Sequence, residues 1–128
     1  MKIEHLGIQV PEPAAMADWY VKNMGFSIKR SSDDPVPVRF IADGSGKVMI
    51  EIYRNPKVGV PDYTTIDPLT LHIAYSCENV PRVMEKLSKA GAKLISGPEN
   101  LPNGDQLAML RDPWGVVIQL CRRANPMV

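Results

Sequence analysis

Two short stretches decide the fold, "HLGIQV" at residues 5–10 and "HIAYSC" at residues 72–77, because they begin two similar halves of the chain. Each is followed by a helix-like segment that ends at a glycine, Gly25 in the first half and Gly91 in the second. Self-similarity at a fixed period identifies the building unit of a chain. We therefore expect a unit of about one strand, one helix and three strands, used twice.

The ends of the two halves also correspond. The segment "VMIEIY" at residues 48–53 corresponds to "VVIQLC" at residues 116–121. This correspondence pairs Glu51 with Gln119, just as the opening segments pair His5 with His72. All four residues are of types that bind metal ions in proteins. Their equivalent positions make them the first candidates for a functional site.

The chain has 128 residues, of which 45% are hydrophobic, and this is enough for one domain with a substantial core. We expect a single domain, 1–128, built from modules at about 1–55 and 69–123. The connecting segment 56–68 is long enough to form a loop over a site.

Composition excludes several classes of partner. The net charge of +1 arises from 15 basic and 14 acidic residues, so neither nucleic acid nor an anionic membrane surface is expected to bind. No apolar run approaches the roughly 18 residues of a membrane span, and the first residues lack the apolar core of a signal peptide. A cytoplasmic location is expected. Cys77 and Cys121 form no CxxC pattern and are expected to be free.

Hydrophobic spacing predicts an α+β fold with two tandem βαβββ modules. Helices are expected at about 14–23 and between Pro81 and Gly91, each on the outer face of a curved mixed sheet that borders a cleft. Strands are expected at about 3–10, 26–32, 36–42 and 47–54 in the first module, and at 69–76, 92–96, 105–111 and 115–122 in the second.

Strand alternation places each of the four polar residues on the less apolar face of its strand. An isolated polar side chain among apolar neighbours is costly to bury, and any one of these residues alone would be read as structural or solvated. Four of them at repeat-equivalent positions favour one common partner, a divalent metal ion. Two imidazoles, one carboxylate and one amide suit Zn, Ni, Co, Mn or Fe, acting as a Lewis acid on a small-molecule substrate.

Five segments resemble the vicinal oxygen chelate superfamily, which includes glyoxalase I, bleomycin-resistance proteins and extradiol dioxygenases. They are "IEHLGIQV", "DWYVKNMGF", "VMIEIY", "LTLHIAY" and "RDPWGVVIQL". The resemblance covers nearly the whole chain and is closest to a short bacterial-type glyoxalase I. It implies a homodimer and a lyase or isomerase of the lactoylglutathione lyase type, in which an enediolate forms on a substrate with adjacent oxygens.

The same resemblance implies the roles of the four candidates. The metal ligands of the family fall on His5, Glu51, His72 and Gln119 of this sequence. Gln119 departs from the glyoxalase pattern, where a glutamate at that position can move a proton and an amide cannot. The catalytic acid-base role is therefore assigned to Glu51.

Three alternatives stay open at this level: a bleomycin-resistance-type binding protein without catalysis, a dioxygenase-related member, and a relative that has lost its chemistry. A binding protein could use aromatic walls, of which the candidates are Phe40, Tyr53, Tyr63 and Trp114. Arg39 and Arg111 could meet an anionic substrate group, although a structural or solvated role is favoured for both. The sequence specifies neither the substrate, the metal, a thiol cofactor, nor whether one chain or two form the site.

Overall fold

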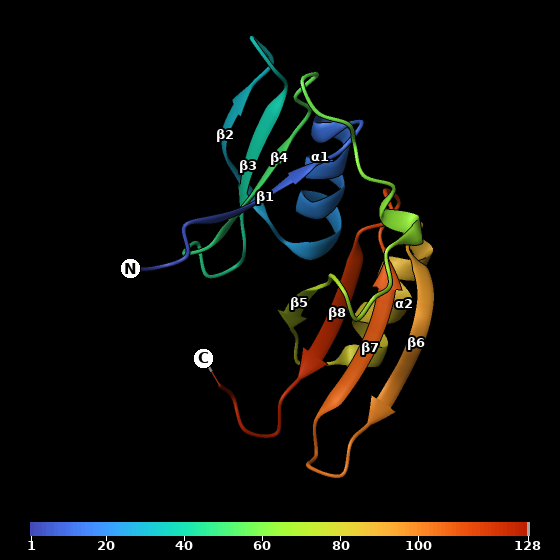
Figure 1. The fold of residues 1–128 in the computed structure, drawn as a ribbon. Helices are drawn as coiled ribbons and strands as arrows, with labels where there is room; N and C mark the ends of the chain where they lie inside the picture. The colour runs from blue at the N-terminus through green and yellow to red at the C-terminus, as the bar shows by residue number, and fades with distance from the viewer. Residues whose placement is uncertain (128) are drawn as a thin grey trace. The chain divides into compact units, whose positions relative to one another are not determined.

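The structure, a computed structural model, describes residues 1–127 and divides into two compact units, Met1–Pro61 and the residues from Asp62 onward. Each unit contains one four-stranded mixed sheet and one long helix (Figure 1). The expected α+β class and the two βαβββ modules are confirmed. The boundary between the units falls inside the predicted connecting segment 56–68.

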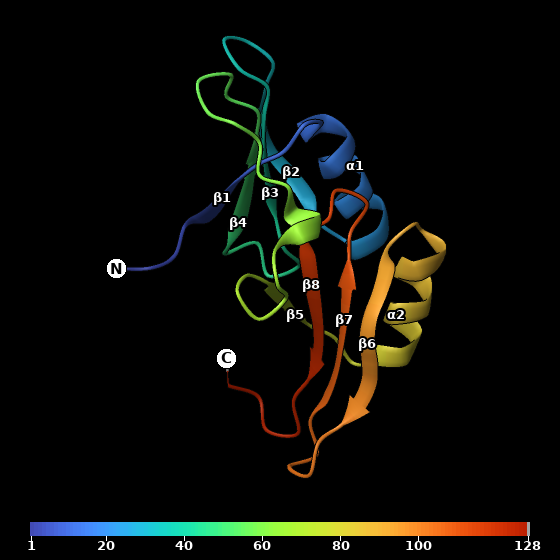
Figure 2. The same ribbon diagram turned by 45° about the vertical axis from the view of Figure 1, so that its right-hand side comes forward.

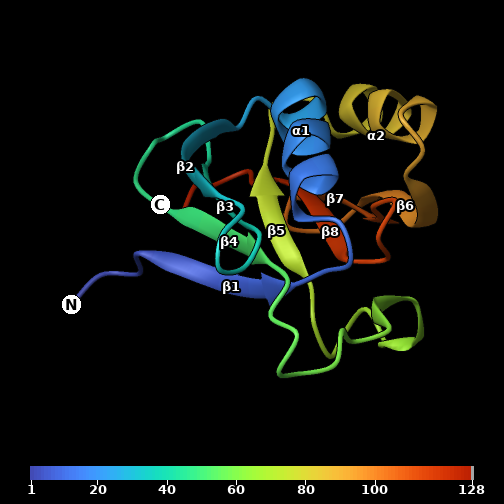
Figure 3. The same cartoon turned by 90° about the horizontal axis from the view of Figure 1, so that it is seen from above.

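In the first unit the sheet order is β1-β4-β3-β2, with β1 parallel to β4 and the other neighbours antiparallel. Figure 3 shows β1 lying beside β4 at the edge of this sheet. The elements are β1 (His5–Gln9), α1 (Pro13–Met24), β2 (Ser27–Ser32), β3 (Val38–Ala42) and β4 (Met49–Tyr53).

In the second unit the order is β5-β8-β7-β6, again with only the first pair parallel. Its helix α2 packs on β6, β7 and β8 (Figure 2). The elements are the 3₁₀ turn η1 (Tyr63–Thr65), β5 (Ile73–Ser76), α2 (Val80–Lys89), β6 (Lys93–Asn100), β7 (Gln106–Arg111) and β8 (Val117–Arg122).

Both helices begin and end where their sequences specify. Helix α1 has Pro13 in its first turn, where no amide hydrogen is needed, and stops at Gly25, whose φ of 75° is left-handed. Helix α2 begins at Asn79, whose side chain accepts a hydrogen bond from the Arg82 amide at 2.9 Å. Neither helix among the described residues is long and apolar enough to cross a membrane.

The cores of the units lie between helix and sheet. On α1, Met16 and Tyr20 are fully buried, and Ile41 and Ile52 of the sheet are buried as well. Leu87 of α2 is equally buried in the second unit. One face of each sheet is therefore committed to its helix, which leaves the other face for function.

The segment between the modules is held by hydrogen bonds at both ends. The Gln9 amide donates to the carbonyl oxygens of Val58 and Gly59 at 2.8 and 2.9 Å. The Arg111 guanidinium donates to the carbonyl oxygens of Tyr63 and Ile66, both at 2.7 Å. This loop is thus tied to β1 in the first unit and to the end of β7 in the second.

Strand β5 begins at Ile73, four residues later than predicted. The Asp67 carboxylate accepts from the Leu69 amide at 2.8 Å, and the Asp67 carbonyl accepts from the Thr70 amide at 2.9 Å. Aspartate bonded in this way to the backbone two residues on forms a turn, which competes with an extended strand. As a result His72 lies at the entrance to β5 rather than in its middle.

The turn between β6 and β7 is joined to the segment after β8 through Asp105, which is buried. Its carboxylate accepts from Arg123 Nη1 at 2.7 Å and from the Ala124 amide at 2.9 Å. The hydrogen bond from Arg123 is the main reason that the pKa of Asp105 lies below its usual value. A lowered folded-state pKa means stabilisation above the ordinary pKa that is lost as pH falls through the folded-state value.

We expect Asp105→Asn to lower the Tm by several degrees near pH 7, and the difference from wild type to shrink as acid protonates the wild-type carboxylate. Calorimetry over a series of pH values measures both effects. Asp33→Asn is the control, because its ion pair with Arg39 is exposed and such pairs contribute little. Equal Tm values for Asp105→Asn and wild type near neutral pH would contradict this assignment.

Candidate metal centre

Glu51 lies on the face of the first sheet that α1 does not cover. Its neighbours on β4, Ile50 and Ile52, are buried at 5% and 0% exposure, whereas the Glu51 side chain is 27% exposed. The register places Gly7 of β1 and Phe40 of β3 directly beside Glu51. These residues form one row across the open face.

Gly7 gives the Glu51 carboxylate its space. A Cβ atom at this position would lie 3.2 Å from Glu51 Oε2 and 3.5 Å from Tyr53 Cε1. The first distance is shorter than most real Cβ contacts, so a side chain here would push the carboxylate away. A glycine opposite the candidate ligand is therefore part of the site, and the sequence alone gave no sign of it.

His5 lies on the same strand, two residues before Gly7, and turns toward Glu51. The distance between His5 Nε2 and Glu51 Oε2 is 3.5 Å. Two donor atoms that each lie about 2.1 Å from one ion are about 3.0–3.4 Å apart for octahedral or tetrahedral angles. His5 and Glu51, the first ligand pair, are thus spaced closely enough to share an ion after a small adjustment.

Glu4 fixes the orientation of the His5 ring. Its carboxylate is hydrogen-bonded to His5 Nδ1, which leaves Nε2 on the side of Glu51. This hydrogen bond is the main cause of the raised pKa of His5, burial opposes it, and the charge of Glu51 adds to it. A carboxylate on the far nitrogen of a metal-ligating histidine sets its tautomer and increases its basicity.

The second unit repeats this arrangement. Its register pairs Ala74 of β5 with Gln119 of β8, as Gly7 is paired with Glu51, and His72 lies two residues before Ala74. Ile118 and Leu120 on either side of Gln119 are buried at 0% and 1% exposure. His72 and Gln119, the second ligand pair, therefore occupy positions equivalent to those of the first pair.

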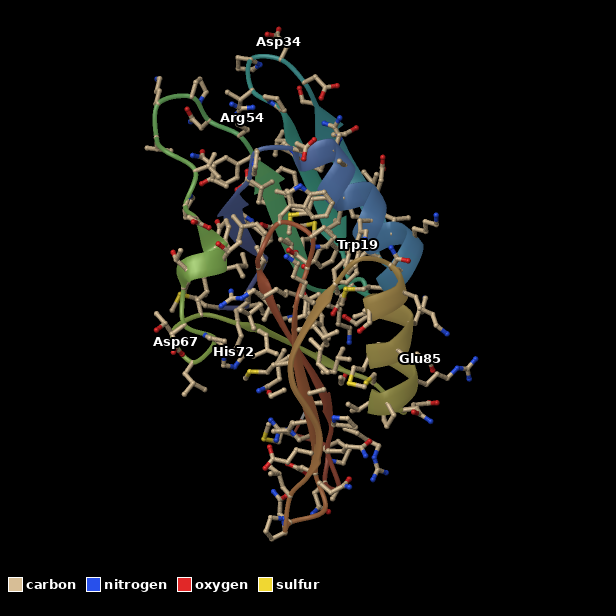
Figure 4. The ribbon with its side chains drawn as sticks, turned by 90° about the vertical axis from the view of Figure 1, so that its right-hand side faces the viewer. Trp19, Asp34, Arg54, Asp67, His72 and Glu85 are labelled. Carbon is tan, nitrogen blue, oxygen red and sulfur yellow. The ribbon has the colours of Figure 1, made fainter. Side chains whose placement is uncertain are left out.

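The His72 ring is held by the turn that precedes β5. Its Nδ1 atom lies 2.7 Å from the Pro68 carbonyl oxygen, so Nδ1 carries the hydrogen and donates it. Figure 4 shows His72 close to Asp67, whose side chain organises this turn. Both histidines thus have Nδ1 engaged by an oxygen and Nε2 left with a lone pair for a metal ion.

The side chains present suit a divalent ion in their chemistry, and the spacing of His5 and Glu51 suits it as well. The second unit supplies one imidazole and one amide oxygen at the equivalent positions. Among residues 1–127, no group of three His, Cys, Asp or Glu side chains is arranged to hold a metal ion. Each described unit therefore supplies two of the four predicted ligands.

The two arginines set aside as structural are confirmed in that role. Arg39 donates to the carbonyl oxygens of Ser32 and Val38 and pairs with Asp33. Arg111 donates to Gly115 in addition to the carbonyl oxygens of the 3₁₀ turn. Both guanidinium groups therefore hold backbone carbonyl groups of neighbouring segments.

A cavity of about 450 Å³ opens beside the first ligand pair. We call it the His5 cavity, and it is lined by Glu4, His5, Lys29, Arg30, Phe40 and Met49. The sequence does not identify Lys29 and Arg30 as site residues, because the segment that forms β2 shows no apolar alternation that would define two faces. In the structure this strand is exposed along most of its length. Only the three-dimensional pairing of β2 with β3 brings Lys29 and Arg30 to the histidine.

The family model of the Glyoxalase/Bleomycin resistance protein/Dioxygenase superfamily matches residues 2–120. The chain belongs to this superfamily. Comparison with curated proteins gives no significant match.

Solved structures of several other proteins share the fold. An antibiotic binding protein from Streptomyces sp. CB03234, TnmS3, is 20% identical with a TM-score of 0.74, and the match covers 97% of each chain. A glyoxalase I mutant from Zea mays is 23% identical with a TM-score of 0.78, and the match covers 97% of this chain but only 46% of that one. TioX from Micromonospora sp. ML1 is 16% identical with a TM-score of 0.70, covering 96% and 99%.

We expect Gly7→Ala to weaken the binding of a divalent ion such as Ni²⁺ by about tenfold, the size of effect seen when the support of a ligand is lost. The reason is the displacement of Glu51 Oε2 by the new methyl group. Titration calorimetry measures the affinity, and urea unfolding verifies that the fold persists. Gly44→Ala is the matched control, since a Cβ there meets nothing within 4 Å. Identical affinities for the two variants would contradict the proposed role of Gly7.

Proposed function

We propose that this protein is a metal-dependent lyase or isomerase of the glyoxalase type, acting on a small substrate with oxygens on adjacent carbons. The observation that supports it best is the first ligand pair, with His5 Nε2 3.5 Å from Glu51 Oε2 and Glu4 on the other ring nitrogen. The equivalent positions of His72 and Gln119 support it further. Membership of the superfamily is consistent with this function and with a small-molecule ligand.

The proposed ligands are His5, Glu51, His72 and Gln119, and the ion is Zn, Ni, Co, Mn or Fe in the divalent state. These ligands contribute one negative charge in total, so a bound ion would retain positive charge and polarise substrate oxygens. Glu4 and the Pro68 carbonyl would hold the two imidazoles in the ligating tautomer. The ligand set then differs between the units only in its oxygen donor.

Glu51 is the residue to which we assign proton transfer. It is the only carboxylate among the four, and the amide of Gln119 cannot accept a proton at neutral pH. Glu51 would take a proton from the carbon bearing the hydroxyl group and return it to the neighbouring carbonyl carbon, through an enediolate of the substrate. Its partial exposure and the open space above Gly7 leave room for the carboxylate to move during this transfer.

A binding protein without catalysis is the second candidate. TnmS3, which shares the fold, is an antibiotic binding protein. The His5 cavity includes the apolar side chains of Phe40 and Met49, which could contact a flat ligand. High affinity for an organic ligand in the presence of a chelator, without turnover after metal addition, would favour this candidate over the enzyme.

We expect wild-type protein to bind Ni²⁺, Co²⁺ or Zn²⁺, and both His5→Ala and His72→Ala to weaken binding by at least about 100-fold through loss of an imidazole ligand. Calorimetry on chelator-treated protein measures this, with Glu85→Gln on α2 as a control remote from either pair. Unchanged affinity in either histidine variant would refute the four-ligand site. Mixing the two variants tests a homodimer with shared sites, since affinity returns in the mixture only if one site draws ligands from two chains.

We expect Glu51→Gln, assayed at a metal concentration that saturates the variant, to reduce kcat by about 100-fold to 10,000-fold, the usual contribution of a positioned base. A panel of hemithioacetals and α-hydroxyketones in D₂O, followed by NMR, reports proton exchange at the reacting carbon independently of product formation. Gln119→Glu is the companion variant, because it restores a carboxylate at the fourth position. Full exchange activity in Glu51→Gln would refute the assignment of the base.

A further inference from the structure

A bulge in β2 turns two basic residues toward the His5 cavity. In the pairing of β2 with β3, Ile28 lies opposite Ile41 and the next pair is Arg30 with Phe40, so Lys29 is an extra residue. A β-bulge re-aims side chains that regular alternation would send to opposite faces. Lys29 and Arg30, although adjacent in sequence, both line the cavity.

Arg30 belongs to the same row as the candidate base. Arg30 pairs with Phe40, and Phe40 pairs with Glu51, so the three lie side by side on neighbouring strands. The Arg30 Cζ atom is 5.9 Å from the centre of the Phe40 ring, which supports the guanidinium by a cation–π contact. The His5 ring meets the same phenyl ring edge-on, with centres 5.5 Å apart.

The charged ends of Lys29 and Arg30 are not engaged in ion pairs among the described residues. Within residues 1–127 neither side chain forms an ion pair, in contrast to Arg39 on the neighbouring strand, which pairs with Asp33. The Glu4 carboxylate in the cavity is bonded to His5 instead. Lys29 and Arg30 are therefore available to pair with an anion that enters the cavity.

We propose that Arg30, assisted by Lys29, binds an anionic group of the substrate, a carboxylate or a phosphate, beside the reacting centre. This inference rests on the proposed function and narrows its substrate to small acids with adjacent oxygens. A guanidinium presents two parallel N–H donors, which match a carboxylate or a phosphate, and the contact of Arg30 with the Phe40 ring holds this group at the cavity. Lys29 supplies charge without that geometry.

The sheet also limits the size of the substrate. Neighbouring strands lie about 4.8 Å apart, so the backbones of Arg30 and Glu51, separated by one strand, are about 10 Å apart. The Arg30 side chain shortens this gap by lying over Phe40. The anionic group is therefore separated from the reacting carbons by a few bonds only.

The test compares matched probes that differ in one anionic group. Dihydroxyacetone phosphate is paired with dihydroxyacetone, and 2-oxoglutarate with its 5-amide, 2-oxoglutaramate. Calorimetry measures binding of each probe to chelator-treated protein at low ionic strength, without reference to catalysis. The phosphate pair and the carboxylate pair together show which anion the subsite accepts.

We expect wild type to prefer the member with the additional anionic group in at least one pair by about tenfold or more, and added salt to reduce that preference. Arg30→Gln should remove most of the preference, Arg30→Lys should restore part of it, and Lys29→Gln should reduce it about two- to threefold. Lys22→Gln on α1 is the control, since it removes the same charge from an exposed position of the same unit. Circular dichroism verifies that each variant is folded.

Equal binding of the two members of both pairs by wild type, no binding of any probe, or an unchanged preference in Arg30→Gln would each overturn the subsite. These results are separate from those that test the enzyme. If metal binding or proton exchange fails but the charge preference depends on Arg30, the proposed function is wrong and the anion subsite stands. If exchange occurs without any charge preference, the anion subsite is wrong and the proposed function stands.

Discussion

The parallel pairing of the first and last strands of each unit is the constraint on which the candidate site depends. It places Gly7 opposite Glu51 and Ala74 opposite Gln119, with a histidine two residues before each small residue. Because strand side chains alternate, a slip of one residue would turn Glu51 toward α1 and a core residue toward the open face. The buried isoleucines on either side of Glu51 prevent that slip, since their burial against the helix fixes the register.

The two units share this frame but differ in chemistry. In the first unit a carboxylate bonds to the far nitrogen of the histidine, the oxygen ligand is a glutamate, and two further cations lie nearby. In the second unit a backbone carbonyl replaces the carboxylate, and the oxygen ligand is an uncharged amide. The carboxylates and cations of the candidate site thus belong to the first unit, where we place proton transfer and recognition of a substrate anion. The second unit contributes an imidazole and an uncharged amide to that site.

Small departures from regular strand structure produce much of the functional detail. The bulge at Lys29 alters which β2 residues share a face with His5, and the turn at Asp67 provides the carbonyl group that orients His72. Glycine at position 7 removes one side chain so that another can occupy its space. Each feature leaves the hydrophobic pattern of the repeat intact, which explains how one module can support different sites within a superfamily.

The repeat, the βαβββ order and the ends of α1 follow from the sequence alone, because hydrophobic period, proline and glycine act through local geometry. The repeat also identifies the four candidate ligands, since they occupy equivalent positions in its two halves. The sequence could not show that Glu4 rather than a distant residue orients His5, since adjacent side chains in a strand usually point apart. Only the tertiary structure showed Gly7 beneath Glu51 and Arg30 beside Phe40. Those contacts depend on the pairing register and on a bulge, and both result from long-range packing that no local pattern records.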